Sequence, residues 1–199
     1  MKIADCSVAF VAGLFLGCSG STPHSAPPAQ QAQTPISAAP VAAAPLEIPW
    51  SSALLEGGEV FDGKAFKLKL PAGWIVEPDP GVALVAQATK TGLYPNIKVA
   101  VLKPPAGTKV SAVVNASKEI YLKHGTVEEV VEMELQGRSV QRMLMTQNLP
   151  GNVNQQLKYF IPAGTRILIF TGQAVPDAFE TQLPIFEAVI RTLELIPLP

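Results

Sequence analysis

The segment "NQQLKYFIPAGTRILIFTGQA", residues 154–174, carries the pattern on which the fold depends. Two runs rich in aromatic and β-branched residues, 154–161 and 166–174, flank a short stretch that contains Pro162 and Gly164. Such runs favour β-strands, and proline and glycine between them favour a turn. The segment therefore predicts a β-hairpin.

More strands are predicted on the N-terminal side of this hairpin. Residues 126–135 and 138–147 form a second strand pair around a glycine-containing turn. Residues 66–70 alternate apolar side chains with lysines, which predicts a strand with one buried face, and Asp62 followed by glycine suits a tight turn before it. The remaining strands are expected at residues 74–78, 82–88 and 96–102.

Two segments change to the helical period of apolar residues. Residues 111–124 form the first, with Thr108 or Ser111 as its cap and Gly125 as its stop. Residues 177–193 form the second, and its buried stripe is expected at Phe179, Leu183, Phe186, Ile190 and Leu193. Hairpin-connected strands with one central and one terminal helix predict an α+β fold, an antiparallel sheet flanked by helices.

Three segments in this order resemble one known family. They are "FKLKLPAGW" (66–74), "YFIPAGTRILIFTGQA" (159–174) and "FETQLPIFEAVIRTLEL" (179–195). Together they resemble the Mog/PsbP-like superfamily, which includes photosystem PsbP proteins, Ran-binding Mog proteins and DcrB-type bacterial envelope lipoproteins. The closing helix departs from the frequent Ser-Phe ending, because this chain has Thr192 and Leu193 there. The resemblance implies an α-β-α sandwich and a non-enzymatic module that binds or helps to assemble protein partners.

The N-terminal residues predict a secreted, lipid-anchored protein. The apolar run Val8 to Leu16 is too short for a bilayer span of about 20 residues, but it is typical of a signal peptide. Phe15-Leu16-Gly17-Cys18 resembles a lipobox, although Phe15 and Leu16 depart from the usual pattern. Residues 1–17 are therefore predicted to be a lipoprotein signal peptide and Cys18 the lipidation site. An ordinary cleaved signal peptide and a short uncleaved anchor are the alternatives.

Composition separates a tether from a globular domain. Residues 18–49 are rich in alanine and proline and almost uncharged, so we expect a disordered tether that could extend roughly 90 Å. Residues 50–199 have the length of a single domain with a sizeable core. The lipobox and the resemblance together predict a bacterial cell-envelope protein. Ser19 after the cysteine favours the outer membrane, with the domain facing the periplasm or the cell surface.

Several kinds of chemistry are poorly supplied in residues 50–199. The chain's net charge of −1 gives no attraction to nucleic acid. Its two cysteines, Cys6 and Cys18, both precede the domain, which therefore has no thiol nucleophile, thiolate ligand or disulfide. His124 is the domain's one histidine and no GxSxG motif is present, so a structural role at the helix end is favoured over catalysis. We predict no catalytic residue, no metal site, no cofactor and no enzyme activity.

The candidate contact residues are Tyr94, in a loop between strands, and an acidic run that includes Glu129, Glu132 and Glu134. The favoured interpretation of the acidic run is cross-strand pairing with Arg138 and Arg142, and a partner-facing patch or a weak cation site are the alternatives.

The leading hypothesis is a module that binds an envelope protein. A small-molecule or lipid-binding protein with a pocket between sheet and helix is the runner-up. A hydrolase that depends on His124 is the third.

Overall fold

The computed structural model describes residues 51–90 and 92–197. The predicted signal peptide, Cys18 and the predicted tether lie outside the described residues. The elements in chain order are a 3-10 helix η1 (Ser52–Leu55), β1 (Val60–Asp62), β2 (Phe66–Lys69), β3 (Ile75–Glu77), β4 (Leu84–Gln87), β5 (Asn96–Leu102), α1 (Val110–Tyr121), β6 (Gly125–Leu135), β7 (Arg138–Leu149), β8 (Asn152–Ala163), β9 (Arg166–Ala174), α2 (Pro176–Ile190) and β10 (Glu194–Leu195).

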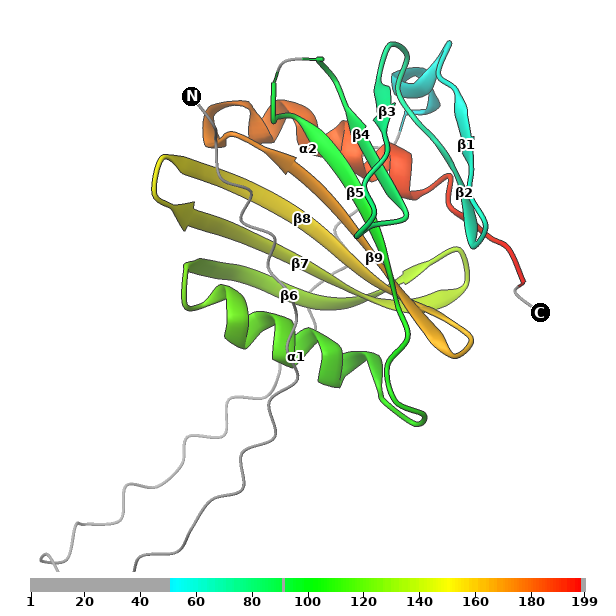
Figure 1. Ribbon diagram of the computed structural model, residues 1–199, viewed down its shortest axis with the longest axis vertical. Coiled ribbons are helices and arrows are strands. Elements are labelled where there is room, and N and C mark those ends of the chain that lie inside the picture. The colour runs from blue at the N-terminus through cyan, green and yellow to red at the C-terminus, as the bar shows by residue number, and fades with distance from the viewer. Residues whose placement is uncertain (1–50, 91, 198–199) are drawn as a thin grey trace, which may run out of the picture. The chain divides into compact units, whose positions relative to one another are not determined.

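The main sheet is antiparallel and has seven strands in the order β3-β4-β5-β9-β8-β7-β6 (Figure 1). The predicted hairpin of residues 154–174 is present as β8 and β9, which pair up to Ala163 opposite Arg166 at the turn. The second predicted hairpin is present as β6 and β7, with Leu135 opposite Arg138. Strands β5 and β9 are distant in sequence and pair along the whole length of β5.

A second, three-stranded sheet lies apart from the main one. Strand β2 pairs with β1 as the predicted hairpin and with β10, where Leu195 lies opposite Phe66. The sequence did not predict β10, because two residues are too short to show a period. The Thr192 hydroxyl fastens this sheet to the end of α2: it accepts a hydrogen bond from the Lys69 amide at 2.9 Å and donates to the Val189 carbonyl at 2.7 Å.

The two helices cover opposite faces of the main sheet, as Figure 1 shows. Successive side chains of a strand point to opposite faces, so Leu157 and Tyr159 of β8 join the core beneath α2 while Phe160 joins the core beneath α1. Phe186 of α2 is fully buried in the first core. The predicted α-β-α sandwich is therefore the observed architecture. No helix in the described ranges is long and apolar enough to cross a membrane.

The predicted ends of the first helix were partly wrong. Lys109 precedes α1 without a side-chain cap, and the Thr108 hydroxyl donates instead to the Pro105 carbonyl at 2.7 Å. Helix α1 ends at Tyr121, and Gly125 begins β6 rather than stopping the helix. A Cβ at Gly125 would collide with the Thr146 carbonyl on β7, so close strand pairing explains this glycine.

Candidate functional site

A buried charge network joins α2 to the sheet. Glu187 lies in the last turn of α2 and is 3% exposed. Its Oε1 accepts from Arg142 Nε at 3.1 Å, and its Oε2 accepts from the Tyr159 hydroxyl at 2.5 Å. Arg142 Nη1 also donates to Glu129 Oε2 at 2.7 Å. Side chains of α2 and of strands β6, β7 and β8 therefore meet in one hydrogen-bonded unit.

The surroundings of this network fix its protonation. Burial raises the pKa of Tyr159 well above the ordinary value of 10.0, and the negative charge of Glu187 raises it further. Burial alone would lower the pKa of Arg142, but its interactions with Glu187, Tyr159 and Glu129 together outweigh burial and raise this pKa above its ordinary value. Tyr159 therefore remains a neutral donor and Arg142 a cation at neutral pH. The network holds the layers together from inside the protein, and this position favours a structural role.

The acidic run divides between the two faces of β6. Glu129 faces the α2 side, opposite Leu144, and binds Arg142. Glu132 faces the α1 side, opposite Gln141, and accepts hydrogen bonds from Gln141 Nε2 and the Ser139 hydroxyl. Glu134 is exposed and lies opposite Ser139 on that same side. The predicted cross-strand pairing is confirmed for Arg142 but not for Arg138, which forms no ion pair with a described carboxylate. The Arg142 pair also lies beneath α2 and not on the solvated face where it was expected. Glu132 and Glu134 remain candidate contact residues on the solvent side.

Tyr94 lies at one end of the main sheet. Its hydroxyl donates to Asn152 Oδ1 at 2.9 Å, so the β4–β5 connection is joined to the β7–β8 turn. Both connections lie at the end of the sheet where α2 begins (Figure 1). Large apolar side chains are also exposed at this end of the sheet: Leu93 on the β4–β5 connection, Leu149 and Val153 beside the β7–β8 turn, and Val175 just before α2. We call Tyr94, Asn152 and these four residues the Tyr94 surface.

Amide side chains lie next to the Tyr94 surface on the α1 side of the sheet. Gln156 Nε2 donates to Gln147 Oε1 at 2.9 Å and to Asn154 Oδ1 at 2.7 Å. Gln156 lies opposite Gln173, which in turn lies opposite Asn96 of β5. Asn96 and Gln156 are 4% and 2% exposed. The side-chain oxygens Asn96 Oδ1 and Gln156 Oε1 have no hydrogen-bond partner in the described part of the chain. This amide cluster was not predicted from the sequence, although the polar run at 154–156 inside an apolar strand was a signal for it.

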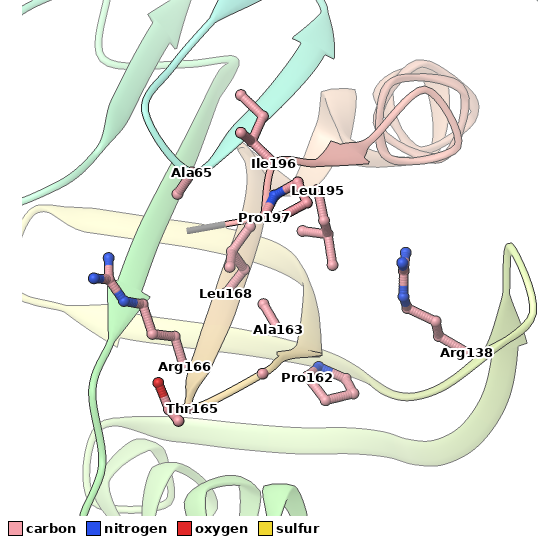
Figure 2. Close-up of a pocket in the computed structure, with 11 residues that line it drawn as sticks. Ala65, Arg138, Pro162, Ala163, Thr165, Arg166, Leu168, Leu195, Ile196 and Pro197 are labelled. Carbon is pink, nitrogen blue, oxygen red and sulfur yellow. The ribbon is translucent and has the colours of Figure 1, made fainter. Parts of the chain in front are cut away.

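An open pocket of about 530 Å³ lies at the opposite end of the main sheet. It is formed by the β8–β9 turn, the start of β7 and the segment after α2 (Figure 2). Two arginines, Arg138 and Arg166, stand on opposite sides of it, and Leu168, Leu195 and Ile196 lie between them in Figure 2. No described carboxylate lines it. This pocket has no signal in the sequence, because its walls come from separate turns.

Metal-ligating side chains do not gather in the described residues. No group of three or more histidine, cysteine, aspartate and glutamate side chains is placed there to hold a metal ion. His124 lies just after α1 with an exposed side chain, and its carbonyl accepts from the Asn148 amide at 2.6 Å. The structural role of His124 and the lack of enzyme activity therefore stay predictions.

Comparisons with known proteins identify the fold. No protein-family model matches the chain, and no curated protein is similar to it. The solution structure of cyanobacterial PsbP (CyanoP) from Synechocystis sp. PCC 6803 matches with a TM-score of 0.54 and 13% identity, covering 69% of this chain and 92% of that one. The domain therefore has the PsbP-like α+β fold that the sequence resemblance implied. At this identity the match carries the fold alone.

Two further solved structures match below a TM-score of 0.5. LpqN of Mycobacterium tuberculosis, which is involved in cell envelope biogenesis, has a TM-score of 0.49 at 11% identity and covers 69% of this chain and 87% of that one. PA94 of Pseudomonas aeruginosa has a TM-score of 0.48 at 14% identity and covers 71% and 98%. These two likenesses are too distant to support an inference about function.

Proposed function

We propose that this protein is a non-enzymatic module of the bacterial cell envelope that binds a partner protein through the Tyr94 surface while a lipid on Cys18 holds it at a membrane. The observations that carry the binding role are the exposed apolar side chains at this end of the sheet and the Tyr94–Asn152 hydrogen bond that joins two of its connections. The anchoring role is carried by the lipobox-like sequence at residues 15–18.

The Tyr94 surface has the composition of a protein-contact site. Leu93 is 69% exposed, and Val153 and Val175 are more than 40% exposed on segments that lie at the same sheet end. Single exposed apolar residues are ordinary, but several at one end of a sheet, on connections that a hydrogen bond joins, favour an interface. Tyrosine at such a position offers a large apolar area and a hydroxyl to a partner. The expected partner therefore presents an apolar patch with few charges.

The proposed interface is tested by photo-crosslinking in living cells of the native producer. A photoreactive residue is placed at Leu93, at Val153, or at Leu102 in the full-length protein. Leu102 is a matched control, since it is an exposed apolar residue at the other end of β5. We expect Leu93 and Val153 to capture the same envelope protein and Leu102 not to capture it. Equal capture from all three positions, or none from the first two, would overturn the assignment of this surface.

Replacing Leu93 by aspartate should weaken partner binding by about tenfold or more, because a charge would then be desolvated in an apolar interface. The variant should fold normally, since Leu93 is 69% exposed and the described core does not depend on it. Partner capture from Val153 and the thermal unfolding midpoint are the two readouts. An unfolding midpoint lowered together with capture would point to a structural role for Leu93 instead.

The lipid anchor is tested by the mass of the N-terminal peptide of the mature protein. We expect that peptide to begin at Cys18 and to carry acyl chains, and we expect Cys18→Ser to release the protein from the membrane fraction because serine cannot form the thioether. A mature start at another residue without a lipid would remove the anchor from the proposal. Fractionation of the two membranes would also decide the outer-membrane placement that Ser19 favours.

A further inference from the structure

The pocket at the end of the main sheet opposite the Tyr94 surface, which we call the arginine pocket, has only positive charges among its described lining residues. Arg138 and Arg166 are its charged lining residues in the described chain. Neither guanidinium forms an ion pair with a described carboxylate, whereas Arg142 pairs with two. The nearby carboxylate of Asp62, the last residue of β1, is paired with Lys67 at 2.9 Å. The local positive charge is therefore left to attract an anion.

The wall between the two arginines is apolar. Leu168 is buried, Leu195 and Ile196 are half-buried, and Ala65 and Pro197 complete the lining on that side. Figure 2 shows Ile196, Leu195 and Pro197 between the arginines. The volume of about 530 Å³ lies in the usual range for small-molecule sites. A ligand that fills the pocket must then bring an apolar body as well as a negative charge.

We propose that the arginine pocket binds an anionic amphiphile, a molecule with a carboxylate or phosphate group on a short apolar chain. A guanidinium group can pair with a carboxylate or with a phosphate through two parallel hydrogen bonds, and the apolar wall would cover the apolar chain of the ligand. The wall is formed by the segment that follows α2, so the chain would lie against Leu195 and Ile196. This site is at the opposite end of the sheet from the Tyr94 surface, and the proposal does not depend on the protein-binding role.

Calorimetric titration of the full chain with defined probes tests the site. The chain carries Cys18→Ser, so that no attached lipid competes for the pocket. The probes are octanoate, octyl phosphate, octanol and inorganic phosphate. We expect octanoate or octyl phosphate to bind at least about tenfold more tightly than octanol and inorganic phosphate. The stronger of the two anions identifies a fatty-acid or a phospholipid type of head group. If octanol binds as tightly as the anions, the arginines do not contribute to binding. If inorganic phosphate binds as tightly as octyl phosphate, the apolar wall does not contribute.

Variants locate the binding. Arg138→Gln and Arg166→Gln should each weaken binding of the preferred anion by about five- to tenfold, and the double variant should weaken it more than either. Lys123→Gln is the control, because Lys123 is an exposed cation at the other end of the sheet, and it should change affinity less than about twofold. Unchanged affinity in the double variant would overturn the site. Partner capture at Leu93 should be normal in that variant, so failure of this proposal is distinct from failure of the binding role.

Discussion

Replacing Arg142 by methionine is expected to lower the free energy of unfolding by about 3–5 kcal/mol. Methionine fills much of the same space, but it removes both hydrogen bonds that the guanidinium makes to Glu187 and Glu129. The Glu187 carboxylate would then be buried beneath α2 with the Tyr159 hydroxyl as its remaining partner. An uncompensated buried charge is among the most costly changes in a protein interior. Urea unfolding followed by circular dichroism measures the loss.

Two further variants show whether the loss comes from the buried charge. Arg138→Met, on the same strand but exposed, should change the free energy of unfolding by less than about 0.5 kcal/mol. Arg142→Met combined with Glu187→Leu should recover a substantial part of the loss, since the unpaired carboxylate is then gone. If Arg142→Met is as stable as Arg138→Met, the network does not join the layers in the way described.

The second large effect is expected at Gly172 of β9. A Cβ at this position would collide with ring atoms of Phe186, a fully buried side chain of α2. Gly172→Ala should therefore force α2 away from the sheet and lower the free energy of unfolding by about 1–3 kcal/mol. Smaller residues on the sheet face beneath α2 allow the aromatic side chains of the helix to approach the backbone.

A double-mutant cycle isolates this contact. Phe186→Leu alone should be destabilising, but Gly172→Ala in the Phe186→Leu background should cost less than it does in the wild-type background, because the smaller side chain makes room for the added methyl group. Thermal or urea unfolding of the four proteins gives the coupling energy. Additive losses would contradict the close approach of Gly172 to the Phe186 ring.

The sequence predicted most of the fold because its long elements have clear periods. The hairpin of residues 154–174 and the stripe containing Phe179 and Phe186 follow local rules, and both are present. The ends of α1 were less predictable, since Gly125 carries the same signal for a helix stop as for close strand pairing. Strand β10 depends on pairing with β2 across more than 120 residues and has no local signal.

The sites were less predictable for a related reason. Glu187 looks like an ordinary polar residue in a helix, and its burial depends on Arg142 and Tyr159, which lie 45 and 28 residues away. A β-bulge between Val127 and Glu129 shifts the register and sends Glu129 to the face beneath α2. Tyr94 could be proposed because a loop aromatic is a local feature. The arginine pocket is formed where turns that are distant in sequence come together, and no local sequence pattern predicts that they do.

The most direct test of the central claim is the crosslinking comparison of Leu93 with Leu102 in living cells. We expect a photoreactive residue at Leu93 to capture one envelope protein reproducibly and one at Leu102 not to capture it. We also expect capture at Val153 to fall when Leu93 is changed to aspartate. The same proteins captured at Leu93 and Leu102, with no effect of the aspartate, would contradict a partner-binding role for the Tyr94 surface.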